Sequence, residues 1–284
     1  MNINFKQSEE MNIPKKIWFL WFQGLSQAPL VVVKCYESWK KHNPDWEVIF
    51  LDEDNITDYI SLPLSKEKIC QLSRNHQSNI IRLELLAKYG GVWADATSLC
   101  RVPLDNWLED YSQAGFFAFI YKTRGYGWIF NWFFAAEKSN PIIVKMSQKL
   151  ISFYQDNEFY HSGKTAKDRI KFLEIFLNRK YKTTRFWTSW IVRKLFKVYP
   201  YFIFHIIFAN LINSERELLE LYKKMKPYYN VGDMGVSGLL RPLTPEIKER
   251  IDSRVVPIYK LSWKYAQDDR YDASILKYLL EETE

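Results

Sequence analysis

Cysteine is scarce in this sequence, with three residues among 284, at positions 35, 70 and 100. None belongs to a C-x-x-C pair or lies beside a cluster of histidines, so the sequence predicts neither a zinc site nor a disulfide framework. A chain of this length forms a hydrophobic core without covalent cross-links. We therefore expect free thiols and a reducing, cytoplasmic compartment.

Targeting signals, repeats and common nucleotide-binding motifs are also missing. The first ten residues are polar and carry both charges, unlike a signal or transit peptide. No repeat or low-complexity linker divides the chain, so we expect a single domain over residues 13–284. The glycine patterns of P-loop and dinucleotide-binding proteins are absent, and the basic residues are scattered without a known readout motif. We therefore expect no nucleic acid partner.

Aromatic residues, in contrast, are abundant, at 17% of the chain with 11 Trp, 18 Tyr and 19 Phe. Their flat amphipathic rings suit sugars, nucleobases and membrane interfaces, although most rings pack in the core. Lys and Arg number 40 against 33 Asp and Glu, a net charge of +7. This charge predicts attraction to an anionic partner, either a nucleotide, a nucleic acid or an acidic membrane.

The first part of the chain has the pattern of an α/β domain. Residues 17–22 form an unbroken apolar run, which indicates a strand buried on both faces. Helical spacing of apolar residues follows over 29–42, and a second apolar strand over 46–51. Strand, helix and strand of these lengths form a crossover unit. Further elements are predicted as a helix over 78–89, strands over 92–94, 116–121 and 128–136, and a helix over 141–154.

Residues 184–212 differ from the rest because basic residues interrupt an aromatic and apolar run. The charges and Pro200 argue against a membrane-spanning helix. Two interpretations remain open: a basic aromatic segment that lies in the plane of a membrane surface, or a helical pair that forms part of the core. In both cases we expect a helical, aromatic and basic insertion over residues 184–225.

The residues with the clearest chemical pattern lie between positions 78 and 97. Ser78, Asn79 and Arg82 are three and four residues apart on the predicted helix, so they project from one side. A glycine pair ends this helix, and Asp95 follows the next strand, where ligands bind in open α/β sheets. A carboxylate there suits Mg²⁺ bound to diphosphate oxygens, with Arg82 as a second positive group. The alternative is a capped helix, a strand and an Asp that only begins a turn.

As an ordered set, these residues resemble the bacterial capsular polysaccharide synthesis protein family. This family shares the pattern S-D-x-x-R…Y-G-G-x-x-x-D-x-[DT] with the yeast initiating mannosyltransferases and the glucosylating clostridial toxins. The resemblance covers residues 13–103 and reappears in the sequence KLSWK at 260–264. It implies a GT-A-type, Rossmann-like mixed sheet flanked by helices. It also implies a retaining hexosyltransferase that uses a UDP-sugar, with Mn²⁺ or Mg²⁺ as the cofactor.

The resemblance also implies roles for individual residues. Asp95, Arg82 and Asn79 would be the catalytic residues, and Asp95 the metal ligand. Trp21 would stack on the uracil, with a plain core position as the alternative. The implied donor-binding residues are Leu20, Trp21, Ser78, Asn79, Arg82, Trp93, Asp95, Ala96, Thr97, Ser262, Trp263 and Lys264.

Two positions depart from the family pattern. Thr97 replaces the second Asp of the metal motif, which leaves one carboxylate fewer for a cation. Asn79 replaces the Asp of the S-D-x-x-R element, and an amide lacks the negative charge that would hold Arg82. We hypothesise that Asn79 shifts the donor preference or lowers the rate.

Two further residues are candidates for the acceptor side. His205 ends the sequence YFIFH, which resembles a Tyr-Phe-x-x-His element of the same family, and the alternative is a core histidine. Asp233 lies in a glycine-bearing segment, where Asp also serves ordinary turns. The expected acceptor is a bacterial surface glycan, lipid-linked if the basic aromatic segment lies on the inner face of the cytoplasmic membrane. The competing function class is a non-catalytic protein that binds a sugar nucleotide, a nucleic acid or a membrane.

Overall fold

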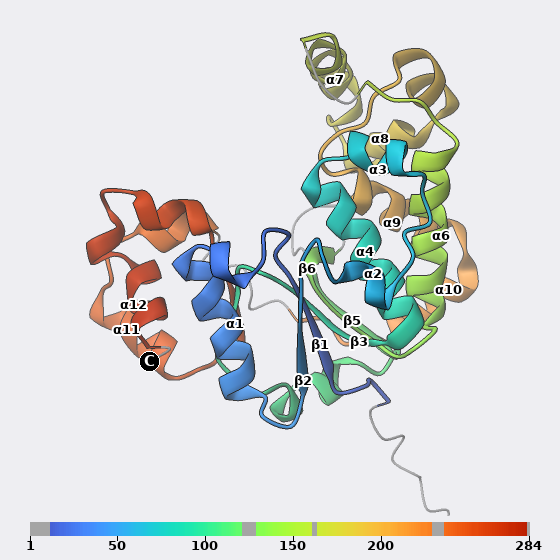
Figure 1. The fold of residues 1–284 in the computed structure, drawn as a ribbon. Coiled ribbons are helices and arrows are strands. Elements are labelled where there is room, and N and C mark those ends of the chain that lie inside the picture. The colour runs from blue at the N-terminus through green and yellow to red at the C-terminus, as the bar shows by residue number, and fades with distance from the viewer. Residues whose placement is uncertain (1–11, 121–128, 161–163, 229–235, 283–284) are drawn as a thin grey trace, which may run out of the picture.

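A five-stranded mixed sheet forms the centre of the protein (Figure 1). The structure is a computed structural model that describes residues 12–120, 129–160, 164–228 and 236–282. The strand order is β2-β1-β3-β6-β5. The strands are β1 (Lys16–Leu20), β2 (Glu47–Leu51), β3 (Gly91–Asp95), β5 (Phe116–Ile120) and β6 (Ile129–Ala136). The predicted mixed α/β sheet flanked by helices is thereby confirmed.

One half of the sheet is parallel and the other half is antiparallel. β1 pairs in parallel with both β2 and β3, as the predicted crossover unit requires. β6 pairs antiparallel with β3 and with β5. The carboxyl ends of β1 and β3 therefore meet at one edge of the sheet, where Leu20 is in register with Asp95.

Helices cover both faces of the sheet (Figure 1). On one face lies α1 (Leu30–His42), and on the other lie α4 (Arg74–Tyr89) and α6 (Pro141–Gln155). Phe19 and Phe133 point toward α1, where they contact Tyr36 and Trp39. The alternating residue Trp18 faces the other side, next to the end of α4. This alternation along one strand explains why β1 reads as a continuous apolar run.

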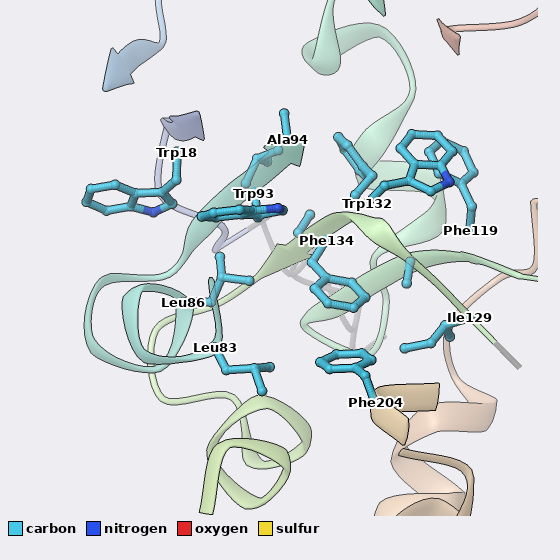
Figure 2. Packing of buried hydrophobic residues seen from close by; sticks show 14 of the residues in the cluster. Trp18, Leu83, Leu86, Trp93, Ala94, Phe119, Ile129, Trp132, Phe134 and Phe204 are labelled. Carbon is cyan, nitrogen blue, oxygen red and sulfur yellow. The ribbon is translucent and has the colours of Figure 1, made fainter. Parts of the chain in front are cut away.

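Aromatic rings fill the layer between the sheet and its helices. Figure 2 shows Trp93 of β3 and Phe134 of β6 beside Leu83 and Leu86 of α4. Phe134 stacks on Phe204 at a centroid distance of 5.9 Å, which anchors α9 (Ile203–Ser214) to the sheet. Burying each such ring contributes about 1.5 to 3 kcal/mol. The large aromatic content is therefore mostly structural.

The glycine pair after α4 is required by two close backbone approaches. Gly90 and Gly91 have φ values of +69° and +94°. A Cβ atom on Gly90 would lie 2.6 Å from the backbone nitrogen of Lys138, and one on Gly91 would lie 2.6 Å from the backbone oxygen of Lys16. Because both neighbours are backbone atoms, a side chain has no room at either position. The pair therefore lets β3 begin directly after α4 while the turn packs against the backbone of Lys16 and Lys138.

The sequence-based element boundaries agree with the structure to within a few residues. α4 is the largest exception, because it begins at Arg74 and not at residue 78. The first strand ends at Leu20, so Trp21 and Phe22 lie in the following loop. The remaining elements are η1 (Leu25–Gln27), α2 (Ile56–Tyr59), α3 (Lys66–Gln71), β4 (Ser98–Cys100), η2 (Leu104–Asn106), α5 (Leu108–Tyr111), α7 (Lys164–Leu177), α8 (Tyr181–Thr184), η3 (Arg185–Thr188), η4 (Ile191–Phe196), α10 (Arg216–Lys223), η5 (Val236–Leu240), α11 (Pro245–Asp252), β7 (Ile258–Lys260), η6 (Trp263–Gln267), η7 (Tyr271–Ala273) and α12 (Ile275–Glu281).

Residues 184–225, where we expect a helical insertion, are helical over most of their length, and the two halves of this segment differ. α9 packs against α6 and is almost entirely buried, in agreement with the core interpretation. The preceding segment leaves Trp190, Ile191 and Leu195 between 55% and 60% exposed. Within the described residues, no helix combines the length and apolarity needed to cross a bilayer.

Candidate functional site

A pocket of about 280 Å³ lies at the carboxyl ends of β1 and β3. Four segments contribute to it: the loop after β1, the first turns of α4, the end of β3, and the chain from β7 to η6. Among the described residues, its lining consists of Leu20, Trp21, Phe22, Gln23, Arg74, Asn75, Ser78, Trp93, Asp95, Ala96, Thr97, Lys260 and Trp263.

Asp95 is held by three donors at the end of β3. Its Oδ1 accepts hydrogen bonds from Nη2 of Arg82 at 3.0 Å and from Nε1 of Trp93 at 2.9 Å. Its Oδ2 accepts from Nζ of Lys260 at 2.8 Å. Burial acts to raise the pKa of Asp95, but the charges of Lys260 and Arg82 outweigh it, so the pKa lies below its usual value. The carboxylate is therefore ionised and fixed at neutral pH.

Arg82 is buried beneath the pocket, with only 3% of its side chain exposed. It donates to the hydroxyl of Ser78 at 3.2 Å and to the backbone oxygen of Asn131. Its guanidinium lies 4.9 Å from the ring centre of Trp93. Burial lowers its pKa, although a guanidinium remains protonated in proteins. The result is a positive charge fixed in place by neighbours on α4, β3 and β6.

Lys260 is a site residue that the sequence interpretation did not select. Its Nζ donates to Asp95 and, at 2.9 Å, to the hydroxyl of Thr97. The antiparallel pairing of β4 with β7 puts Lys260 opposite Ser98, next to Thr97. The signal available in the sequence was its place at the start of the KLSWK element. Only the pairing of two short strands far apart in the chain shows that it reaches Asp95.

Two indole rings form the aromatic side of the pocket. The rings of Trp21 and Trp263 meet edge to face, with centroids 6.2 Å apart. Nε1 of Trp21 is buried and has no hydrogen-bond partner among the described residues. Trp93 has a different place, because its indole donates to Asp95 and covers Arg82. The structure thus brings together Trp21 and Trp263, two of the residues that the resemblance implies for donor binding.

Asn79 does not belong to the described lining of the pocket. It is 4% exposed, and its Oδ1 accepts a hydrogen bond from Nδ2 of Asn131 at 3.1 Å. The backbone oxygen of Asn131 in turn accepts from Arg82. Asn131 therefore links Asn79 to Arg82 through hydrogen bonds.

Several other candidate residues also lie away from the described lining. Ser262 is the N-cap residue of η6, and Nζ of Lys264 lies 5.7 Å from the ring centre of Trp263. His205 is buried on α9 against the rings of Phe202 and Phe204. Burial and the charge of Arg82 lower the pKa of His205 to about 4. Asp233 lies outside the described residues.

The donor set around Asp95 does not suit a divalent cation. Both carboxylate oxygens accept hydrogen bonds from cationic or indole N–H groups, and the Thr97 hydroxyl accepts one from Lys260. Within the part of the chain that the structure describes, no three His, Cys, Asp or Glu side chains lie close enough to hold a metal ion. Mg²⁺ prefers carboxylate oxygens in an octahedral arrangement. The expected coordination by Asp95 would require Lys260 to leave its place.

Comparisons with known proteins identify a family over more than half of the chain. The family described as "Capsular polysaccharide synthesis protein" matches residues 1–162. The O-glycosyltransferase braB of Annulohypoxylon truncatum is 28% identical over 151 residues, which cover 46% of this chain and 35% of that protein. The glycosyltransferase afumC of Aspergillus fumigatus is 30% identical over 149 residues, which cover 45% of this chain and 38% of that protein.

These alignments span little more than a third of each curated relative. Among solved structures, the PaToxG glycosyltransferase aligns over 84% of this chain and 83% of its own, with a TM-score of 0.40 and 16% sequence identity.

Proposed function

The chain belongs to the capsular polysaccharide synthesis protein family, and we propose that it is a glycosyltransferase that moves a hexose from a UDP-sugar to a glycan with retention of configuration. One observation carries this proposal. Asp95 is fixed between Arg82 and Lys260 in a pocket that also contains two adjacent indole rings. A base-stacking surface and a fixed cationic group are the two features that a nucleoside diphosphate needs.

The base of the donor would lie against Trp21 and Trp263. Stacking of a nucleobase on an aromatic side chain contributes about 1 to 3 kcal/mol. The buried Nε1 of Trp21 has no hydrogen-bond partner among the described residues, so the ring face of Trp21, and not its N–H, is the part that a base would contact.

The diphosphate would lie toward Arg82 and Lys260. During transfer, the bond between the anomeric carbon and the diphosphate oxygen breaks, and its electron pair leaves with UDP. The acceptor hydroxyl forms the new bond from the same face and gives its proton to the departing diphosphate. Fixed positive groups stabilise the charge that develops on the leaving group, so no protein nucleophile is needed. Asp95 would hold these cations in position.

Binding of UDP, measured by thermal stabilisation, tests the base-binding part of the proposal. We expect the unfolding temperature to rise with UDP, because a ligand that binds only the folded state stabilises it. Trp263→Ala should remove most of this rise, whereas Trp190→Ala, which removes an exposed indole outside the pocket, should preserve it. Equal stabilisation of both variants would contradict the assignment.

A screen of UDP-sugars for hydrolysis, followed by transfer assays, tests the catalytic part. Slow release of UDP from one sugar nucleotide is expected, since water replaces the acceptor. Binding of UDP without any release or transfer would favour the competing function, a non-catalytic sugar-nucleotide-binding protein.

The acceptor side of the proposal rests on a second surface, which we name the α7–η4 surface. It consists of the exposed side chains of Phe172, Ile175, Phe176, Trp190, Ile191 and Leu195. Phe172 stacks on Phe196 at 6.3 Å, so the two segments lie side by side. Basic residues at 185, 193, 194 and 197 accompany the apolar side chains. Exposed apolar side chains accompanied by basic residues are typical of proteins that bind anionic membranes.

The helical region that carries this surface also reaches the pocket. Asn75, a lining residue, donates a hydrogen bond to the hydroxyl of Tyr201 at 3.2 Å. We therefore propose a lipid-linked acceptor, presented at the inner face of the cytoplasmic membrane. Its sugar would reach the pocket past Tyr201.

Co-sedimentation with vesicles tests the membrane part of the proposal. Vesicles that contain phosphatidylglycerol should bind the protein at low salt, and neutral vesicles should bind it weakly. Trp190→Ser combined with Leu195→Ser should reduce binding. Leu30→Ser, which changes a side chain of similar exposure on α1, should not reduce it. Absence of binding to anionic vesicles would remove the membrane proposal and leave the donor site unaffected.

A further inference from the structure

The family pattern implies a divalent cation at Asp95, yet the position beside Oδ2 of this carboxylate is taken by Nζ of Lys260. We propose that the ammonium group of Lys260 replaces the divalent cation and binds the β-phosphate of the donor directly. The inference rests on the proposed function and adds to it that Lys260, in place of a metal ion, neutralises the leaving group. It assigns to this chain a metal-independent form of diphosphate binding.

The geometry of Lys260 suits this role. Asp95 and Thr97 accept two of the three N–H donors of its ammonium group, at 2.8 and 2.9 Å. Lys260 lines the pocket, and 26% of its side chain is exposed. The third N–H is therefore available to a ligand oxygen in the pocket. Two fixed acceptors hold the flexible side chain in place before the ligand binds, which lowers the entropic cost of binding.

The replacement of the second Asp by Thr97 is complementary to Lys260. A second carboxylate would add negative charge that requires a divalent cation. The neutral hydroxyl of Thr97 accepts a hydrogen bond from the ammonium group instead. With Thr97, the group of Arg82, Lys260 and Asp95 has two positive charges and one negative charge, a net charge of +1. Such a group attracts a diphosphate, whereas it repels a metal ion.

The backbone around Lys260 is held in place by the pairing of two strands. β7 pairs with β4, and the backbone N–H of Leu261 donates to the backbone oxygen of Thr97 at 2.7 Å. The chain then continues directly to Trp263 at the aromatic side of the pocket. One short segment thus supplies a contact for the base and a contact for the phosphate.

Calorimetric titration of the full chain with UDP, UMP and uridine tests the proposal, each in EDTA and in Mn²⁺. The wild-type protein should bind UDP in EDTA, with an affinity that Mn²⁺ changes by less than about twofold. Lys260→Met should weaken UDP binding about tenfold or more, the usual effect of removing a charged hydrogen bond. Its affinity for uridine should be unchanged, and Lys260→Arg should recover part of the affinity for UDP.

Lys223→Met is the matched control, because Lys223 pairs with Glu220 on the surface of α10. It should bind all three ligands as the wild type does. UDP binding by the wild type only when Mn²⁺ is present would overturn the inference and leave the proposed function intact. Equal binding of UDP by the wild type and Lys260→Met in EDTA would also overturn it. If the wild type binds none of the three ligands under either condition, the proposed function itself fails.

The comparison with uridine separates a contact to phosphate from a structural role. Should Lys260→Met disturb the fold of the pocket, uridine binding would be lost together with UDP binding. The metal dependence of the wild-type protein then decides the question by itself, because it requires no variant.

Discussion

The sheet region, residues 12–120 and 129–160, and the helical region, residues 164–223, are both rich in aromatic residues but place them differently. In the sheet region, the rings of Trp18, Trp39 and Trp93 are at most 1% exposed, and each indole N–H has an acceptor. In the helical region, Phe172 and Trp190 are at least half exposed. The family match ends at residue 162, close to the boundary between the two regions. The comparison teaches that aromatic content by itself does not distinguish a core from a surface.

Asp95→Asn should have the largest effect on activity, and it acts in the sheet region. Loss of the charge that holds Arg82 and Lys260 should lower the transfer rate by about 100- to 1,000-fold. It should also lower the free energy of unfolding by about 2 to 4 kcal/mol, since a buried cation loses its partner. Rates of UDP release and urea unfolding would measure these effects. Asp105→Asn is the control, because Asp105 also accepts from a lysine and a tryptophan, Lys15 and Trp46, away from the pocket.

Trp18→Ala and Trp190→Ala compare the two regions directly. The first should lower the free energy of unfolding by about 3 to 5 kcal/mol, because it leaves a cavity in the core. The second should change it by less than about 0.5 kcal/mol. Urea denaturation of both variants provides the measurement. Similar losses in the two variants would mean that the exposed indole packs against another part of the chain.

Gly91→Ala tests whether the sheet region depends on its close backbone approach. The positive φ and the contact with the backbone oxygen of Lys16 should cost about 2 to 4 kcal/mol in the free energy of unfolding. Gly238→Ala provides the contrast, because its nearest neighbour is the flexible side chain of Arg241. Thermal unfolding of the two variants should differ clearly, and equal stabilities would argue against the described turn.

His205 provides the smallest of the four effects, and it concerns the interface between the regions. Its pKa is lowered to about 4 in the folded protein, mainly by burial, so the unfolded state binds a proton more readily as the pH falls below about 6.5. Above this pH the histidine is neutral in both the folded and the unfolded state and costs no stability. The free energy of unfolding then decreases progressively between pH 6.5 and 4. We expect a loss of about 1 to 3 kcal/mol from this group.

Urea denaturation at pH 7.5 and 4.5 checks this expectation. The wild-type protein should lose more stability than His205→Gln over this interval, because the amide does not titrate. The same loss in both proteins would show that other groups cause the pH dependence.

Much of the candidate site could be predicted from short stretches of sequence. Leu20 and Asp95 are the last residues of β1 and β3, two adjacent parallel strands that arise from apolar runs, so their proximity follows from the strand pattern once the strands pair. Arg82 and Asp95 are only 13 residues apart, on a helix and a strand joined by the tight glycine turn. Helical spacing also put Asn79 on the side of Arg82, but β6 covers that position, and Asn79 bonds to Asn131. The spacing on one helix does not show which neighbour covers each face.

The sequence by itself determined the local elements, the glycine-dependent turn and the carboxylate at the end of β3, because these depend on residues close together in the chain. Only the tertiary structure decided that Lys260 meets Asp95 and that the helical region divides into a buried α9 and an exposed α7–η4 surface. The physical reason is that β4 and β7 are only three residues long each and are separated by the 157 residues from 101 to 257. Hydrogen bonding and burial select such a pairing within the folded protein, and hydrophobic periodicity does not reveal it.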